Sequence, residues 1–491
     1  MKPKAWSNEA TRRLTQGQSV YVKDAVEAWI PAVVVEEADS RLTVTVQLAD
    51  DSIVTRKSSE VLARSEETEL FTCSSLTELN PVNEASALDC LHQRFSHDIF
   101  YTAAGTTIVA VNPFKDVHHL YNQHKIQDYH RPLQTLDPHI FMIGEKAYAH
   151  MLREMGNINQ SIVVSGESGA GKTVSAKHLL KYLTIVSSPE NEINLECSIP
   201  ASVIERRVLD SNPILESFGN AATPRNENSS RFGKFIQLQF HRNGFILGGV
   251  IQTYLLEKTR VVHQGPGENN FHIFYQLMSL GDMDQVPSWL VAVRAEVQHS
   301  GLDCTVPQQA ETLSVLQTVE AMSDIGVSTS QQVSIFKILL AILHLSTMKF
   351  ISIKDGEACT FSDTEVSSRT KEECCRLLGI SALSLHHALL NRKIVTGTKA
   401  HQSVYVKPVT VAEAQSRRDS LAMLLYSRIF DWLVNFINTQ IKADTFDHCI
   451  NLLDIYGFET FEINNLEQLC INYANERLQQ HYVTHFLRDL Q

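Results

Sequence analysis

The sequence predicts an α/β protein in which helices flank a central mixed, mostly parallel sheet, preceded by a small β-barrel. Four short runs rich in β-branched residues lie between residues 17 and 63, separated by charged or turn-forming clusters, and these indicate the barrel. From residue 70 onward, strand-like and helix-like patterns alternate. The clearest unit is the apolar run 161–164, which leads through a glycine-rich turn into the helical spacing of residues 174–182.

The composition disfavours several classes of protein. The chain has 491 residues, of which 43% are hydrophobic, so it can bury a large core and form more than one domain. A net charge of −12 argues against a general nucleic-acid or anionic-membrane binder. Nine cysteines without a C-x-x-C pair indicate reduced thiols, so we expect a cytoplasmic protein. Because the apolar stretches are short, we expect no transmembrane segment.

We expect three parts along the chain: a flexible N-terminus (1–14), the β-barrel (15–64) and an α/β domain (65–491). The expected elements of the α/β domain are two strands within 99–111, strands at 235–240, 245–254 and 450–453, and helices at 76–94, 140–155, 204–218, 268–278, 334–345, 412–437 and 465–487. The chain stops inside the last of these patterns without a capping glycine, so we expect a truncation there.

Residues 166–173 read G-E-S-G-A-G-K-T, which matches the phosphate-binding loop of nucleoside triphosphatases. Its glycines let backbone N–H groups turn inward around phosphate oxygens. Lys172 supplies a cation for the β- and γ-phosphates, and the Thr173 hydroxyl can ligate Mg²⁺. A chance glycine-rich turn is the alternative, and the flanking strand and helix disfavour it. The candidate nucleotide-binding residues are Gly166, Glu167, Ser168, Gly169, Ala170, Gly171, Lys172 and Thr173.

Two later segments have the chemistry to complete such a site. Residues 226–234 read N-E-N-S-S-R-F-G-K, and a loop of such short hydroxyl and amide side chains can surround Mg²⁺ and phosphate oxygens. A polar turn is the alternative interpretation. Asp454 ends an apolar strand and Gly457 follows, so a carboxylate could hold a Mg²⁺-bound water while a glycine N–H reaches the γ-phosphate. Neither segment is specific when taken alone.

Together, these motifs resemble those of the myosin motor domain. Residues 166–173 resemble its phosphate loop letter for letter, 226–234 its first switch, and D-I-Y-G-F-E at 454–459 its second switch. N-P-F-K at 112–115, with Tyr121, resembles its purine-binding loop, with one residue more than the commonest spacing. The resemblance covers residue 70 to the C-terminus and implies a P-loop nucleoside triphosphatase fold. The N-terminal module resembles the Src-homology-like barrel that precedes many myosin motors.

The resemblance implies a role for each matching residue. Arg231 and Glu459 would form an ion pair between the two switches that positions the attacking water, with Ser229 as a candidate proton relay. The implied catalytic residues are Ser229, Arg231, Gly457, Glu459 and Lys172. Further implied nucleotide contacts are Asn112, Pro113 and Tyr121 for adenine, with Asn226 and Asn228 in the first switch. The implied Mg²⁺ ligands are Thr173 and Ser230 directly, and Asp454 through water.

The resemblance implies an ATP-dependent, actin-based motor that hydrolyses Mg-ATP, binds actin filaments and works in the cytoplasmic actin cytoskeleton. Residues 391–407 resemble an actin-contacting loop, and we predict that phosphorylation of Ser403 strengthens actin activation. Light chains or calmodulin would bind only a neck beyond this sequence, and no nucleic acid is expected. One alternative is a truncated fragment that binds nucleotide or a partner without motor activity. The other is a P-loop enzyme outside the motor family, such as a kinase; Arg231 and Glu459 have no role in a small-molecule kinase.

Overall fold

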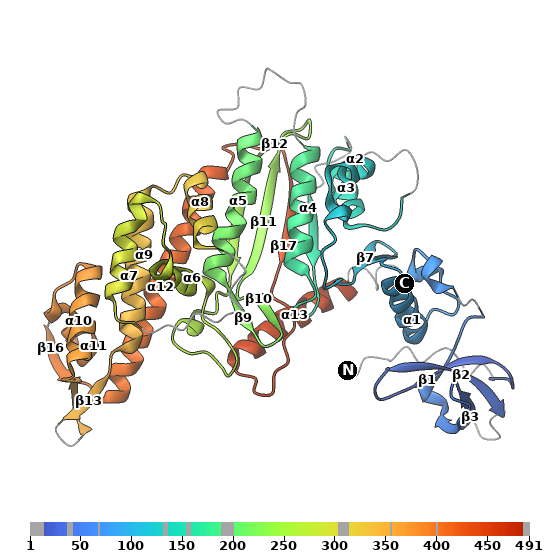
Figure 1. Ribbon diagram of the computed structural model, residues 1–491, viewed down its shortest axis with the longest axis horizontal. Coiled ribbons are helices and arrows are strands. Elements are labelled where there is room, and N and C mark those ends of the chain that lie inside the picture. The colour runs from blue at the N-terminus through green and yellow to red at the C-terminus, as the bar shows by residue number, and fades with distance from the viewer. Residues whose placement is uncertain are drawn as a thin grey trace. The chain divides into compact units, whose positions relative to one another are not determined.

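The computed structural model describes residues 14–36, 43–66, 69–130, 136–153, 159–187, 201–302, 314–353, 356–398 and 401–484 (Figure 1). The chain divides into two compact units, Met1–Lys146 and Ala147–Gln491. The expected boundary between a barrel and the α/β domain at residue 64 therefore stays a prediction. The seven cysteines within these described ranges are all free, in keeping with the expected reduced thiols.

The first unit begins with a five-stranded antiparallel sheet of order β4-β3-β2-β1-β5. Its strands are β1 (Ser19–Lys23), β2 (Trp29–Glu36), β3 (Thr43–Leu48), β4 (Ile53–Lys57) and β5 (Val61–Ala63). Alternate valines such as Val20, Val34 and Val46 point to one face and form its core, as the two-residue period of a strand requires. The strands predicted between residues 17 and 63 are confirmed, whereas their closure into a Src-homology-like barrel stays a prediction.

The rest of the first unit is helical, with one hairpin. Helix α1 (Glu84–Ser96) begins after Asn83, whose side chain accepts a hydrogen bond from the Ser86 N–H at 2.8 Å and so caps the helix. The predicted pair of strands forms as β6 (Tyr101–Ala104) and β7 (Thr107–Ala110), and the left-handed Gly105 lies in the turn between them. Helices α2 (Gln123–Tyr129) and α3 (Ile140–Met151) follow, and the boundary between the units falls within α3.

The second unit is built around a four-stranded sheet of order β12-β11-β17-β8. Its strands are β8 (Gln160–Val164), β11 (Gly233–Phe240), β12 (Ile246–Tyr254) and β17 (His448–Asp454). The sheet is mixed, as expected, but the prediction that it is mostly parallel is wrong for the described strands. Only β17 and β8 pair in parallel there, because β11 and β12 form a hairpin and β11 also pairs antiparallel with β17.

Helices cover this sheet and extend from it (Figure 1). Helix α4 (Lys172–Val186) contacts β17 and β8, while α5 (Ala201–Gly219) and α12 (Val411–Ile441) contact β12. The expected helix through Pro213 is confirmed as part of α5. The remaining helices are α6 (His272–Ser279), α7 (Val291–His299), α8 (Val315–Ile325), α9 (Thr329–Thr347), α10 (Glu365–Leu378), α11 (Ala382–Leu390) and α13 (Leu466–Tyr482). The predicted end of the last helix at 487 lies outside the described residues.

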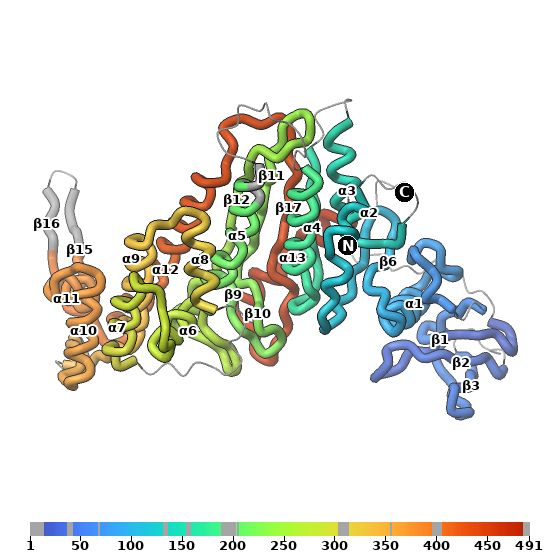
Figure 2. Tube along the Cα trace, turned by 45° about the horizontal axis from the view of Figure 1, so that its top comes forward, coloured from blue at the N-terminus to red at the C-terminus, as the bar shows by residue number. Residues whose placement is uncertain are grey.

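Two further hairpins lie beyond the sheet. Strands β13 (Phe350–Ile353) and β14 (Ala358–Phe361) form one, and β15 (Asn391–Thr398) and β16 (His401–Pro408) form the other. Strand β15 contacts α11, the helix that it directly follows (Figure 2). Within the described residues, one helix, α12, is long and apolar enough to cross a membrane. That finding is weak, because core helices pass the same test, and Tyr426, Phe430 and Leu433 of α12 are buried inside the unit.

Candidate nucleotide site

The phosphate-loop motif lies between the end of β8 and the start of α4, as its sequence predicted. Gly169 and Gly171 have φ angles of 83° and 85°, in the left-handed region where a Cβ is unfavourable. Gly171 is also the N-terminal cap of α4, so the free backbone N–H groups and the positive end of the helix dipole face the loop. The loop therefore has the backbone geometry of an anion-binding site.

Lys172 is the cation of this loop, and its side chain is buried. Its ammonium group donates hydrogen bonds to the carbonyl oxygens of Gly166 at 3.0 Å and Glu167 at 2.6 Å. Burial lowers the pKa of Lys172, although the nearby carboxylates of Asp454 and Glu459 oppose the shift. A bound phosphate would offset the solvation that the buried ammonium has lost, so burial of Lys172 favours binding of an anion next to it.

The first-switch motif is a hairpin rather than the expected loop. Strand β10 (Asn226–Ser230) pairs antiparallel with β9 (Asn220–Thr223), with an irregular register between Asn226 and Ser229. A bulge of this kind re-aims side chains, which explains how polar residues remain exposed to a site while their backbone pairs. The Ser230 hydroxyl donates to the Phe232 carbonyl at 2.8 Å and keeps its lone pairs for a metal ion.

Within this hairpin, Asn226 and Asn228 have partners already. The Asn226 side-chain oxygen accepts from the Asn228 N–H at 3.0 Å. The Asn228 side-chain oxygen accepts from Asn220 at 2.9 Å and lies 3.1 Å from His272 Nε2. Burial lowers the pKa of His272 to about 4, so its ring is neutral near pH 7. These contacts hold Asn228 from the side of α6.

The second-switch motif begins where β17 ends at the buried Asp454. Asp454 lies opposite Val164 in the parallel pairing and opposite Lys234 in the antiparallel pairing, so two strands bring it to the phosphate loop. Burial raises the pKa of Asp454, and the Lys234 ammonium, a hydrogen bond from Thr173 and the charge of Lys172 limit that rise. The Asp454 carboxylate and the Thr173 hydroxyl therefore lie within hydrogen-bonding distance of each other.

Gly457 lies against the phosphate loop. A Cβ built on Gly457 would collide with the Ser168 backbone N and the Lys172 ammonium, so this position has no room for a side chain. The Ser168 N–H donates to the Phe458 carbonyl at 3.3 Å, which ties the second switch to the loop by a backbone hydrogen bond. The second switch is thus closed onto the phosphate loop in this structure.

Arg231 and Glu459 form a buried ion pair between the two switches. Their side chains are 0% and 1% exposed, and the guanidinium uses both terminal nitrogens, with Nη2 donating to Glu459 Oε2 at 3.1 Å and Nη1 to Oε1. Nη1 also donates to Ser229 Oγ at 3.1 Å. A two-pronged pair between residues 228 positions apart fixes both distance and angle between the motifs.

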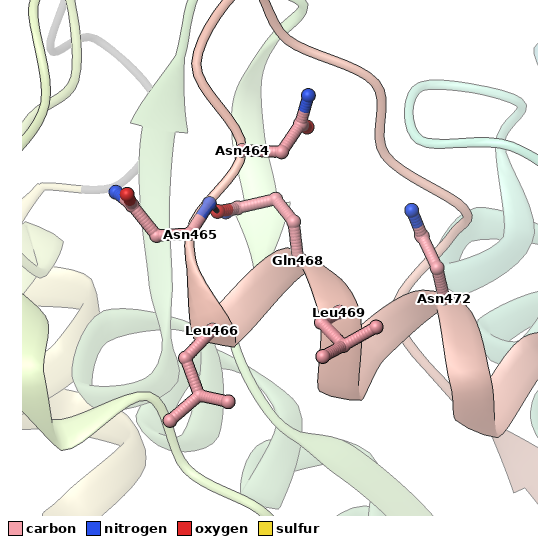
Figure 3. Close-up of a pocket in the computed structure, with 6 residues that line it drawn as sticks. All are labelled: Asn464, Asn465, Leu466, Gln468, Leu469 and Asn472. Carbon is pink, nitrogen blue, oxygen red and sulfur yellow. Dashed lines mark hydrogen bonds between the residues drawn. The ribbon is translucent and has the colours of Figure 1, made fainter.

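Helix α13 holds the far side of Glu459. The Asn472 side chain accepts from the Glu459 N–H at 2.9 Å and donates to its carbonyl at 2.7 Å. Asn472 also lines a hollow of about 500 Å³ at the start of α13, where Gln468 extends from the same side of the helix (Figure 3). This hollow contains none of the predicted nucleotide-binding residues.

The predicted adenine contacts belong to the first unit. Asn112 accepts a hydrogen bond from the Phe114 N–H at 3.1 Å, next to Pro113, and Phe114 has a φ of 50°. The Tyr121 hydroxyl lies 2.5 Å from that of Tyr101, and burial raises the pKa of Tyr121. Their contact with adenine stays a prediction, since the second unit contains the phosphate loop.

The three predicted Mg²⁺ ligands offer two hydroxyl oxygens and one carboxylate. Mg²⁺ prefers oxygen ligands and is usually held by one or two carboxylates together with waters and substrate phosphates. Thr173, Ser230 and Asp454 therefore fit a Mg²⁺ ion bound with a triphosphate. Across the described residues, no group of three or more His, Cys, Asp or Glu could hold a metal without such a ligand.

Comparisons with known proteins agree with this geometry. The sequence profile of the family described as "Myosin head (motor domain)" matches residues 73–491. The chain belongs to this family. It is 44% identical over 437 residues to unconventional myosin-XIX of Xenopus laevis, covering 87% of this chain and 43% of that protein. It is 37% identical over 486 residues to unconventional myosin-Vb of Mus musculus, covering 96% and 26% respectively. The myosin motor chain thus spans less than half the length of these relatives.

Some residues of the site were not found by sequence reasoning. Glu257 contacts Arg231, Lys234 lies opposite Asp454, and Asn472 holds Glu459. Lys234 ends the segment 226–234, Glu257 follows the strand expected at 245–254 and Asn472 lies in the helix expected at 465–487, and no local pattern distinguishes these three residues from their neighbours. The one available signal is a charged or amide residue within an apolar stretch, as with Glu257 directly after T-Y-L-L.

Proposed function

We propose that this chain contains the Mg-ATP-binding and ATP-hydrolysing site of an actin-based motor. The observation that carries the proposal is the buried Arg231–Glu459 pair, which links two switch motifs next to a phosphate loop. Phosphoryl transfer needs positioning and charge neutralisation more than covalent chemistry, and this arrangement supplies both. Family membership supports the proposal, since the named relatives are myosins.

The residues take the following roles in the proposal. The phosphate loop holds the triphosphate by its backbone N–H groups, and Lys172 neutralises the β- and γ-phosphates. Thr173 and Ser230 would ligate Mg²⁺ directly, and Asp454 would hold it through water. When bound, the metal neutralises the developing charge on the phosphates. Asn226, Ser229 and the Gly457 N–H would face the γ-phosphate, and Asn228 would be a further nucleotide contact. Asn112, Pro113 and Tyr121 would contact adenine.

Hydrolysis in this proposal is attack by water on the γ-phosphorus. The new bond joins the water oxygen to that phosphorus, and the bond from phosphorus to the β–γ bridging oxygen breaks, which leaves ADP and phosphate. The Ser229 hydroxyl would accept one proton from the attacking water and give its own proton to a γ-phosphate oxygen. Arg231 and Glu459 exclude bulk water and hold the attacking water in line when the switches close.

For actin, we propose the β15–β16 hairpin as one contact. Arg392 and Lys407 are opposite each other in its register, and Lys393 is adjacent, so three exposed cations gather on one hairpin. They suit an acidic filament surface. Ser403 pairs with Thr396 through the backbone, and its side chain lies outside the described ones. Regulation by its phosphorylation stays a prediction.

Equilibrium binding of a fluorescent ATP analogue with Mg²⁺ tests the nucleotide part. We expect Lys172→Ala to abolish binding, while Lys181→Ala, an exposed lysine on the same helix α4, leaves it within twofold. Equal binding by both variants would refute the site. Co-sedimentation with actin filaments, released by ATP, then separates a motor from a fragment that only binds nucleotide.

A further inference from the structure

Arg231 has a second carboxylate partner that lies outside both switch motifs. Glu257 lies three residues after the end of strand β12 at Tyr254. Its Oε2 accepts a hydrogen bond from Arg231 Nε at 2.6 Å. The Glu257 N–H also donates to the Arg231 carbonyl oxygen at 3.0 Å. Two contacts, one from the side chain and one from the backbone, therefore attach Glu257 to the first switch.

Glu257 is itself held from behind. Its Oε2 also accepts from Arg260 Nε at 2.9 Å, and Arg260 Nη2 donates to Glu268 Oε1 at 3.1 Å. Arg260 Nη1 donates to the Asn269 carbonyl at 3.0 Å. The Arg260 side chain is 1% exposed, so this support is part of the core rather than a surface pair. The position of the Glu257 carboxylate is thereby fixed independently of Glu459.

The guanidinium divides its N–H groups between the two carboxylates. Nε points to Glu257, whereas Nη1 and Nη2 point to Glu459. Holding an arginine by Nε leaves its terminal pair of nitrogens free as a planar fork, which is the geometry that a carboxylate accepts with two hydrogen bonds. A lysine carries all three of its N–H donors on one nitrogen, so it has no such planar pair of nitrogens.

We propose that Glu257 is a positioning residue that fixes the position and orientation of the Arg231 guanidinium. Glu459 can then form and break its two hydrogen bonds to Nη1 and Nη2 while Arg231 stays in place. The inference rests on the proposed function of the site. When the second switch opens and Glu459 moves away, a buried cation without a partner would be costly. Glu257 provides that partner, so opening the switch does not require the first switch to rearrange. The Arg260–Glu268 pair keeps Glu257 aligned.

The test compares Glu257→Gln with wild type in three measurements. These are the affinity for fluorescent Mg-ATP, the single-turnover rate of phosphate formation, and the half-life of fluorescent Mg-ADP trapped with vanadate, which mimics the transferring phosphoryl group. We expect affinity within about twofold, but a turnover rate and a trapped half-life each reduced at least about tenfold, as loss of a charged hydrogen bond implies. Glu296→Gln on α7, which removes a partner of Arg376, is the matched control and should change none of the three measured quantities.

A second background distinguishes positioning from a structural role. In a Glu459→Ala chain, in which neither acceptor of Arg231 Nη1 and Nη2 at position 459 remains, adding Glu257→Gln should shorten the trapped half-life no further, because Glu257 acts only through those two nitrogens. A further loss of similar size in that background would overturn the proposal. Equal trapping by wild type and Glu257→Gln, or a proportional fall of affinity and turnover together with the melting temperature, would also overturn it.

Two outcomes are kept apart by the same set of measurements. If wild type does not bind Mg-ATP, the proposed function fails, and this inference fails with it. If Glu257→Gln does not fold, Arg260→Met is measured instead. This variant removes the hydrogen bond from Arg260 to Glu257 and keeps both carboxylates that pair with Arg231, those of Glu257 and Glu459. It should shorten the trapped half-life at least threefold, and an unchanged half-life would overturn the proposal.

Discussion

The two ends of the switch ion pair should contribute unequally to stability. Arg231 is fully buried between Glu459, which is 1% exposed, and Glu257, which is 11% exposed. Arg231→Met removes the cation that forms the buried ion pair with Glu459 and leaves two carboxylates with less compensation. Glu459→Gln instead leaves Arg231 paired with Glu257, and the new amide oxygen can still accept from the guanidinium.

The magnitudes follow from this difference. Removing one partner of a buried pair costs about 3–5 kcal/mol when it leaves a buried charge uncompensated, and we expect Arg231→Met in this range. Losing the charge of one acceptor while keeping the hydrogen bond costs about 1–3 kcal/mol, which we expect for Glu459→Gln. Glu296→Gln, whose partner Arg376 is 48% exposed, should cost less than about 1 kcal/mol.

The pH dependence of the free energy of unfolding provides a second measure of the triad formed by Arg231, Glu257 and Glu459. Burial alone would raise the pKa of Glu257, but the guanidinium groups of Arg231 and Arg260 hold it below its usual value of 4.5. A carboxylate with a lowered folded pKa adds stability above its unfolded pKa and loses it as pH falls through the folded pKa. Wild type should therefore keep this contribution down to pH 4.5. Arg231→Met should show a smaller loss of stability below pH 4.5, because without this guanidinium the folded pKa of Glu257 lies closer to its unfolded value.

Urea unfolding followed by circular dichroism, at pH 7 and between pH 6 and 4, gives these differences as shifts of the midpoint at constant slope. The reasoning would be refuted if Glu459→Gln cost as much as Arg231→Met. That result would mean that Glu257 does not compensate Arg231, and that the pair rather than the triad is the stabilising unit.

Three further predictions concern close packing and titration. Gly457→Ala should lower the single-turnover rate of ATP hydrolysis about a hundredfold, because the added Cβ would push the second switch off the phosphate loop. The affinity for Mg-ATP should stay within about fivefold of wild type, and an unchanged rate would contradict the prediction. Gly219→Ala should lower the free energy of unfolding by about 1–3 kcal/mol, because its Cβ would overlap the buried Phe232 ring, and Gly265→Ala at a looser contact serves as the control. Burial lowers the pKa of His272 from its usual value of 6.5 to about 4. Its contribution to the free energy of unfolding is therefore complete above pH 6.5, and up to about 3 kcal/mol is lost as pH falls toward 4. His272→Phe should flatten that part of a stability–pH curve measured by urea unfolding, and an equally steep curve would show that other groups titrate there.

Much of the site could be predicted because each motif is local. The phosphate loop needs glycines at fixed backbone angles, a lysine and a following helix, and all of these lie within one stretch of chain. Likewise, Asp454 could be recognised at the end of an apolar strand. The prediction failed where pairing partners matter. A polar run such as 226–230 reads as a loop, and only its pairing with β9 shows that it is a strand.

The sequence by itself determined the nucleotide chemistry, the order of the motifs and the family, because these depend on residue types at short, fixed spacings. Tertiary structure alone decided which groups complete the site. Lys234 meets Asp454 only because β11 pairs with β17, and Arg231 meets Glu257 only because the chain returns along β12. Contacts between residues tens to hundreds of positions apart depend on strand register and close packing, and neither leaves a periodic trace in the chain.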